Sequence, residues 1–206
     1  MESFRYDFTF YYLNILENNL KEDIKQCINV LRNGGTILYP TDTIWGIGCD
    51  ATNENAVRRV FEIKQRADSK SLILLAESAS QISVYVEKIP EIAYDLIEIS
   101  DKPLTIIYSN AKNLAKSVVA EDGSVGFRVP KDDFCQMLCK MFGKPIVSTS
   151  ANTSGEKSPA NFTEITENII KSVDYVVKFR QDDKTLSAPS SIIKLGQNAE
   201  IQIIRK

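Results

Sequence analysis

The chain has 206 residues, of which 43% are hydrophobic and 25% charged, and its formal net charge is −2. These values are typical of one soluble globular domain with a sizeable core, and they argue against a surface built mainly for nucleic acid or membrane. The chain has no histidine, which excludes Ser-His-Asp and Cys-His catalysis and an imidazole base.

No apolar run approaches the ~20 residues that span a bilayer. The first 15 residues are aromatic but include Glu2 and Asp7, and they lack the basic region and cleavage site of a secretory signal. We therefore expect a cytoplasmic protein whose N-terminal segment forms an edge strand or a lead-in packed on the core. In that compartment the cysteines are expected as core thiols rather than disulfides or metal ligands: Cys27, Cys49, Cys135 and Cys139.

Hydrophobic periodicity predicts helices and strands that alternate along the chain. The expected helices span residues 20–32, 54–65, 79–86, 90–99, 132–142 and 163–172. The expected strands span residues 36–39, 71–76, 104–108, 124–128, 145–149, 175–179, 190–194 and 201–205. Asn53 and Asp132 are expected to cap helices, and Gly143 to end one. Residues 40–48 are interpreted as a loop.

This order predicts an α/β fold over residues 1–206: a single-domain, twisted, open sheet of mixed parallel and antiparallel strands flanked by helices. The antiparallel part is expected because the last strands have no helices between them. In open α/β sheets ligands bind beyond the carboxyl ends of strands. Three loops in such positions carry hydroxyl groups or cations, at residues 40–43, 128–130 and 148–152.

Two cations occur in the sequence "EIKQR". Positions i and i+2 of a helix point in roughly opposite directions, so Lys64 and Arg66 face one anion only if the helix ends near Gln65. The pair would then suit a polyphosphate. The alternative is a solvated basic helix end that complements the helix dipole.

The segment "IVSTSANTSG" follows a buried strand. Ser148, Ser150 and Asn152 share one side of an extended chain and offer two hydroxyls and an amide to a ligand, although such residues also build ordinary turns. Arg128 ends the strand in "SVGFRVP", where it would clamp a carboxylate or form a surface salt bridge. Neither a P-loop motif nor a G-x-G-x-x-G motif after a strand occurs.

Together and in this order, these stretches resemble the threonylcarbamoyl-AMP synthase family, the YrdC-like proteins. The resemblance covers roughly residues 20–194. The matching segments are "GGTILYPTDTIWGIGCDATNENAVRRVFEIKQR", "KPLTIIY", "VGFRVP" and "PIVSTSANTSGEKSP". Its most specific parts are the P-T-D-T…G-x-G loop, K-x-R and S-x-N, and it implies a YrdC-like fold.

The resemblance implies a nucleotidyltransferase reaction. L-threonine and bicarbonate give a carbamate that attacks the α-phosphate of ATP, so that pyrophosphate leaves and threonylcarbamoyl-AMP remains. Mg²⁺ is expected with the ATP, and no protein metal site is expected. A separate ligase complex would pass the threonylcarbamoyl group to adenosine in tRNA. The substrate's own carbamate is the nucleophile, which agrees with a chain that lacks histidine.

The resemblance also assigns site residues. The ATP site it implies consists of Lys64, Arg66, Ser124, Ser150, Asn152 and Ser158, with Lys64 and Arg66 also catalytic through neutralisation of the triphosphate charge. The L-threonine site it implies consists of Thr41, Arg128 and Ser148, with Arg128 facing the carboxylate.

The chain departs from the family pattern at several positions. Trp45 stands where the family usually has Tyr, and Ala67 stands where Pro usually follows K-x-R. Lys70 stands where the family has a His that often touches threonine, and Ser191 stands for the Thr of a Pro-Ser-Thr motif. A second family branch lacks an intact K-x-R and S-x-N, so this chain is placed with the synthases. Two alternatives stay open: a non-catalytic nucleotide- or RNA-binding module of the same fold, and carbamoyl transfer as in the related domain of hydrogenase-maturation proteins.

Overall fold

The computed structural model describes residues 19–65, 72–185, 188–196 and 200–206. Four subjects of the sequence predictions lie outside these ranges: the N-terminal segment, Arg66, Ala67 and Lys70.

Within the described residues the strands form one mixed sheet, ordered β7-β1-β2-β6-β3-β5-β4-β8-β9. The pairs β1–β7, β3–β5 and β4–β8 are parallel and the other neighbours are antiparallel, which confirms the predicted open α/β sheet. The strands are β1 (Ile37–Tyr39), β2 (Gly46–Gly48), β3 (Ile73–Leu75), β4 (Leu104–Tyr108), β5 (Val125–Arg128), β6 (Ile146–Ser150), β7 (Tyr175–Val176), β8 (Ser191–Leu195) and β9 (Ile201–Arg205).

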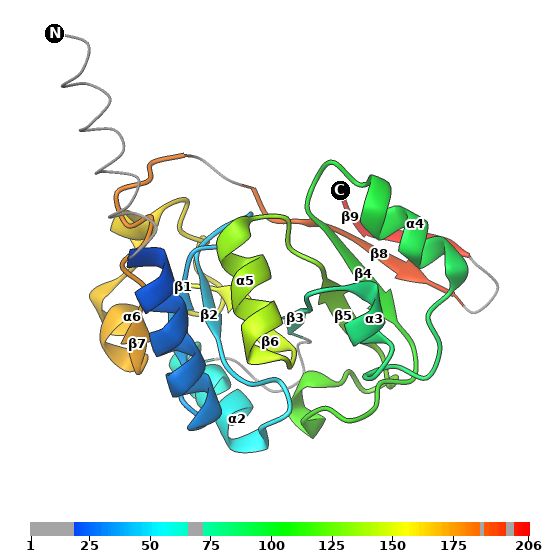
Figure 1. Ribbon diagram of the computed structural model, residues 1–206, viewed down its shortest axis with the longest axis horizontal. Coiled ribbons are helices and arrows are strands. Elements are labelled where there is room, and N and C mark those ends of the chain that lie inside the picture. Colours follow the sequence, from blue (N-terminus) through cyan, green and yellow to red (C-terminus); the bar gives the residue numbers. More distant parts are fainter. Residues whose placement is uncertain (1–18, 66–71, 186–187, 197–199) are drawn as a thin grey trace, which may run out of the picture.

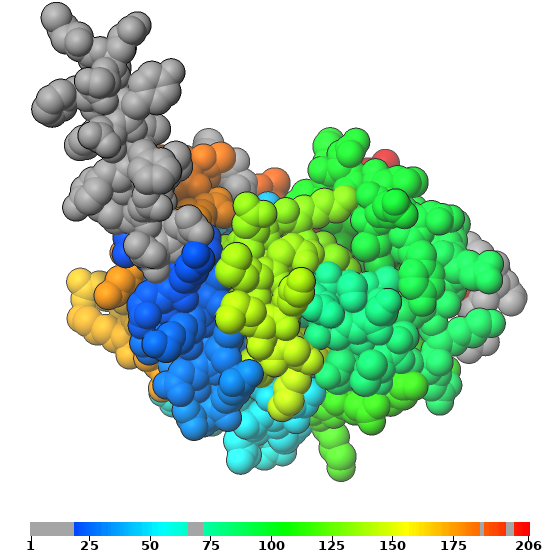
Figure 2. All heavy atoms as spheres, in the orientation of Figure 1, coloured from blue at the N-terminus to red at the C-terminus, as the bar shows by residue number. Residues whose placement is uncertain are grey.

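Helices cover the face of the sheet that Figure 1 presents, where the helix of residues 19–32, α5, α3 and α4 lie in front of the strands. Figure 2 shows these helices closing that face into a continuous surface. The labelled helices are α2 (Glu54–Ile63), α3 (Ala79–Ile82), α4 (Glu91–Ile99), α5 (Asp133–Phe142) and α6 (Glu167–Ser172), with 3-10 turns at Lys116–Val118 and Phe162–Glu164. No described helix is long and apolar enough to cross a membrane.

Local signals in the sequence explain where α2 and α5 begin and end. The Asn53 side chain accepts from the first turn of α2, and Asp132 accepts from the backbone N–H of Cys135. Gly143 ends α5 with φ 77°, a left-handed conformation that glycine adopts without steric cost. The cysteines Cys27, Cys49, Cys135 and Cys139 are free and buried, which confirms the prediction of core thiols.

The prediction of a loop through residue 48 is wrong, because Gly46–Gly48 form β2 between β1 and β6. A strand of the sequence Gly-Ile-Gly has no alternating side-chain pattern, so periodicity does not reveal it. The glycines are needed for packing. A Cβ on Gly48 would lie 2.7 Å from both the Tyr39 ring and the Val147 carbonyl oxygen.

Two predicted helices are also shorter than expected. Residues 79–86 are helical only to Ile82, because Val86 pairs with Ala111 in an isolated β-bridge. Residues 163–172 divide into a 3-10 turn and α6, because Ile165 and Thr166 are extended and Ile165 is buried in the core. Neither change moves a predicted site residue.

Candidate active site

A cavity of about 260 Å³ lies between the loop after β1, the end of β5, strand β6 and the last two strands. Its polar lining combines hydroxyl side chains with two guanidinium groups: Thr43, Ser148, Thr149, Ser150, Ser158, Ser190, Arg128 and Arg205. Trp45, Leu72, Ile73 and Ile192 contribute apolar walls. No carboxylate lines the cavity in the described part of the chain. Such a lining favours an anionic ligand with hydrogen-bonding groups.

Gly46 of β2 lines this cavity next to β6. Gly46 pairs with Ser150, and a Cβ on Gly46 would lie 3.4 Å from the Ser148 hydroxyl. The Trp45 ring packs against Phe162 with ring centroids 4.8 Å apart, so the aromatic wall that replaces the family's Tyr is fixed by a neighbouring ring.

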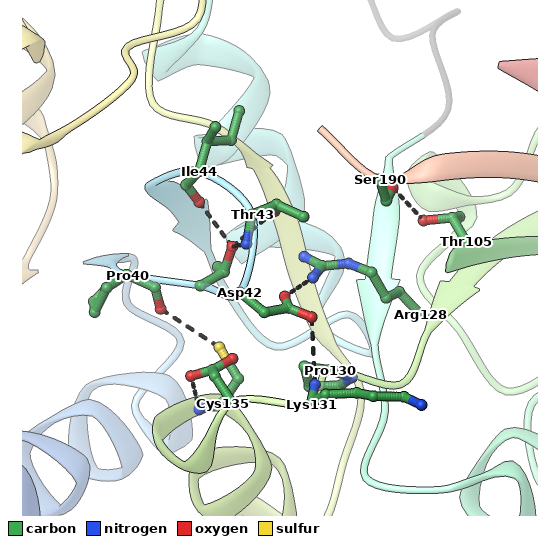
Figure 3. A network of polar contacts seen from close by, with 12 residues as sticks. Pro40, Asp42, Thr43, Ile44, Thr105, Arg128, Pro130, Lys131, Cys135 and Ser190 are labelled. Atoms are coloured by element: carbon green, nitrogen blue, oxygen red, sulfur yellow. Dashed lines mark hydrogen bonds and ion pairs between the residues drawn. The ribbon is translucent and has the colours of Figure 1, made fainter. Parts of the chain in front are cut away.

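The loop after β1 closes on itself through hydroxyl groups (Figure 3). Thr41 Oγ1 donates to the Ile44 carbonyl at 2.8 Å and accepts from the Thr43 backbone N–H at 3.0 Å. The two threonine hydroxyls lie 2.9 Å apart. Because the one proton of Thr41 goes to Ile44, the Thr43 hydroxyl donates to Thr41 and keeps its own lone pairs for other donors. Thr43, and not Thr41, lines the cavity.

Arg128 reaches the cavity from the end of β5 and is held by a carboxylate (Figure 3). Its Nη1 donates to Asp42 Oδ1, and the exposed fractions of the two side chains are 4% and 9%. The interpretation as a surface salt bridge is therefore wrong. Arg128 Nε is buried and has no hydrogen-bond partner among the described residues. Burial lowers the pKa of Arg128, yet a guanidinium stays charged near neutral pH.

Lys64 lies at the C-cap of α2 and is only 2% exposed. Its Nζ donates to the carbonyl oxygens of Ser150 and Asn152, at 2.5 and 2.7 Å. The interpretation as a solvated helix end is therefore wrong for Lys64. Gln65 follows with φ 49°, so the helix ends where the two-cation hypothesis requires. The structure thus brings Lys64 beside the S-x-N segment, more than 80 residues away in sequence.

Asn152 organises the turn that follows β6. Its Nδ2 donates to the carbonyl oxygens of Thr153 and Glu156, at 2.8 and 2.9 Å, while its Oδ1 is buried without a hydrogen-bond partner in the part of the chain that the structure describes. The Ser154 backbone N–H donates to the Lys64 carbonyl at 2.8 Å. These bonds fasten the turn to the end of α2 and leave one side-chain acceptor available.

The predicted site residues that the structure describes fall into three groups. Arg128, Ser148, Ser150 and Ser158 line one cavity. The residues of the second group do not line the cavity, but they bond to residues that line it or to neighbours of these: Lys64, Asn152 and Thr41. Ser124 forms the third group and is described separately below.

Ser124 precedes β5, whereas Arg128 ends it. A rise of ~3.3 Å per residue separates the two by about 13 Å. Ser124 Oγ donates to Asp122 Oδ1 at 2.6 Å, and Lys194 Nζ donates to Asp122 Oδ2 at 2.6 Å. Hydrogen bonds from Lys194 and Ser124 lower the pKa of Asp122 to about 2. The structure does not place Ser124 in the lining of the cavity.

Sequence reasoning missed four polar residues of the lining: Thr43, Ser190, Arg205 and Thr149. Arg205 Nε and Nη2 donate to the Ser190 carbonyl at 2.9 and 2.6 Å, and the Ser190 hydroxyl lies 2.8 Å from that of Thr105. The second Thr of P-T-D-T and the Pro-Ser before β8 were visible signals for the first two. No local sequence pattern indicates Arg205, because only the register between β8 and β9 places it opposite Ile192.

Comparisons with known proteins identify the family to which the chain belongs. The family model Sua5_yciO_yrdC, described as "Telomere recombination", matches residues 29–206. A relative from Pseudoalteromonas translucida, named threonylcarbamoyl-AMP synthase, is 36% identical over 157 residues, 75% of this chain and 84% of its own. P. abyssi Sua5 complexed with L-threonine matches with a TM-score of 0.74 at 27% identity, over 84% of this chain but 50% of its own. E. coli YciO matches with a TM-score of 0.76 at 26% identity, over 89% and 88% of the two chains.

Proposed function

Because the chain belongs to the Sua5–YciO–YrdC family, we propose that its cavity makes threonylcarbamoyl-AMP from L-threonine, bicarbonate and ATP. The protein is a threonylcarbamoyl-AMP synthase, a nucleotidyltransferase that acts in threonylcarbamoyladenosine modification of tRNA. Its product passes to a separate ligase complex that modifies the tRNA.

The buried Arg128 is the main support for placing L-threonine at this end of the cavity. Arg128 lines a cavity rich in hydroxyl groups, and its Nε is buried without a hydrogen-bond partner among the described residues. An unmet buried donor of this kind costs about 1–3 kcal/mol unless a ligand or water accepts from it. The carboxylate of L-threonine is a matching acceptor. Ser148 lines the same site, and the Thr43 oxygen is an acceptor for the substrate's nitrogen. Thr41 positions Thr43 through the contact between their hydroxyl groups.

The nucleotide lies along the S-x-N side of the cavity. Ser150 and Ser158 present hydroxyls there, and Asn152 Oδ1 is free to accept from a donor group of the nucleotide. Lys64 holds the backbone of this segment. The family resemblance assigns the phosphates to Arg66 as well, which lies outside the described residues. Ser124 lies outside this lining with its hydroxyl bonded to Asp122, so it takes no part in these nucleotide contacts.

Catalysis then consists of positioning and charge neutralisation. The threonine carbamate attacks the α-phosphorus in line with the departing pyrophosphate, and preorganised cations stabilise the charge on the phosphoryl oxygens. Lys64 and Arg66 have this role. Mg²⁺ is expected to enter with ATP as part of the substrate. Among the described residues, no cluster of three or more acidic, histidine or cysteine side chains that could hold a metal occurs.

Pyrophosphate release tests this function. We expect release from ATP only when both L-threonine and bicarbonate are present, with threonylcarbamoyl-AMP as the nucleotide product. Tight retention of RNA without such release would support a binding module instead, and release that depends on carbamoyl phosphate would support carbamoyl transfer.

A further inference from the structure

Asp42 is the one acidic residue of the loop after β1, and no step of the proposed reaction uses it. Its neighbours Thr41 and Thr43 bond to each other, and Thr41 also donates to the Ile44 carbonyl, so the loop is closed without any help from the carboxylate. The carboxylate instead points out of the loop toward β5 and the segment after it (Figure 3).

The carboxylate of Asp42 has two partners, and both come from one short stretch of chain. Oδ1 accepts from Arg128 Nη1, and Oδ2 accepts from the backbone N–H of Lys131 at 3.3 Å. Burying a carboxylate is costly unless it is paired and hydrogen-bonded. Here one buried acid meets one buried cation, so neither charge is left uncompensated.

The contact with Nη1 determines which part of the guanidinium remains available. A guanidinium binds a carboxylate in a bidentate way through two neighbouring N–H groups. Asp42 occupies Nη1, and the Nε–H group is left buried and without a partner among the described residues. The guanidinium therefore keeps the edge that contains Nε for a ligand of the cavity.

We infer that Asp42 is a positioning residue for the amino acid: it holds the Arg128 guanidinium so that its Nε edge meets the substrate carboxylate. This inference rests on the proposed function. Without Asp42 the long Arg128 side chain keeps its charge but loses the partner that fixes its rotamer. Asp42 itself touches no substrate, so its whole effect on threonine passes through Arg128.

A double-mutant cycle separates this role from a structural one. Steady-state constants for threonine and for ATP are measured on the wild type, Asp42→Asn, Arg128→Ala and the double variant, with thermal unfolding of each. We expect Asp42→Asn to raise the threonine KM at least tenfold and to change the ATP KM less than twofold. In the Arg128→Ala background, Asp42→Asn should leave the threonine KM unchanged.

Two further variants complete the design. Asp133→Asn makes the same chemical change at an exposed acid in the first turn of α5, and both constants should stay at the wild-type values. Asp42→Glu keeps the charge and should have a threonine KM closer to that of the wild type than Asp42→Asn does.

Three results would overturn the inference. These are an unchanged threonine KM in Asp42→Asn, an equal rise in both substrate constants, and an effect of full size in the Arg128→Ala background. Calorimetric titration of L-threonine into the same proteins distinguishes a failure of the proposed function. A wild type that binds threonine without pyrophosphate release still allows the cycle to be read from dissociation constants. A wild type that does not bind threonine removes both the inference and the proposed function.

Discussion

Two buried cations flank the cavity, and the protein holds them in different ways. Arg128 is paired with a side-chain carboxylate, whereas Lys64 is bonded to two main-chain carbonyl groups. The Arg128 partner carries a charge and compensates the cation directly. The carbonyl partners of Lys64 belong to Ser150 and Asn152, so its ammonium group lies next to the S-x-N segment.

This difference indicates different functions for the two ends of the cavity. A compensated guanidinium with one open edge suits a ligand whose own charges balance, such as a zwitterionic amino acid. An ammonium group beside hydroxyl groups suits a polyanion such as a triphosphate. The two residues also differ in their effect on the fold, because Lys64 bonds the turn after β6 to the end of α2.

The largest effect is expected from Lys64→Ala. Loss of one preorganised charge at the nucleotide end should cost about 2–4 kcal/mol of transition-state stabilisation, measured as kcat/KM for ATP in the pyrophosphate assay. The exposed Lys140 on α5 provides the control, and Lys140→Ala should keep the wild-type kinetics. Unchanged kinetics in Lys64→Ala would contradict its assigned role, and a loss of thermal stability without loss of kcat/KM would reduce it to a structural one.

Arg128→Ala should act on the other substrate. Loss of a charge-assisted hydrogen bond to a carboxylate costs about 1.5–3 kcal/mol, so the threonine KM should rise by roughly 10- to 100-fold while the ATP KM changes little. Arg58→Ala is the matched control, because Arg58 is an exposed arginine paired with Glu54 on α2. Equal increases in both constants would place Arg128 outside the threonine site and remove the contrast between the two ends.

Ser158→Ala tests whether Ser158 contacts ATP at the nucleotide end of the cavity. Loss of one neutral hydrogen bond costs about 1 kcal/mol, so the ATP KM should rise about fivefold and the threonine KM should stay constant. Ser80→Ala changes an exposed serine of α3 and should alter neither constant. A rise in the threonine KM alone would move Ser158 to the amino-acid end.

The smallest effect is expected at the exposed pair of Asp122 and Lys194, which contrasts with the buried pair of Asp42 and Arg128. A carboxylate with a lowered pKa stabilises the fold above its unfolded-state pKa and loses that contribution as the pH falls toward about 2. In Lys194→Ala, NMR titration should show the pKa of Asp122 closer to its ordinary value, with both KM values unchanged. An altered ATP KM would show that this surface cluster, which includes Ser124, belongs to the nucleotide site.

The sequence by itself determined the regular elements whose signals are local. The helix at 19–32, α2 and α5 follow from apolar side chains at helical spacing, from the Asn53 and Asp132 caps, and from Gly143. The placement of Arg128 and Ser150 at the carboxyl ends of β5 and β6 followed from polar residues that come at the ends of apolar segments. Strand β2 could not be found in this way, because glycines carry no pattern and their need arises only from Tyr39 and Val147 across the sheet.

Only the tertiary structure decided the partners. Asp42 and Arg128 are separated by 86 residues, as are Lys64 and Ser150, and sheet register together with helix packing brings each pair together. The same holds for Arg205, which reaches the cavity because β9 pairs with β8. Local sequence encodes propensity over a few residues, whereas the burial and pairing of a charge depend on everything that surrounds it in space. That is why the elements of this site could be predicted from the sequence and its ion pairs could not.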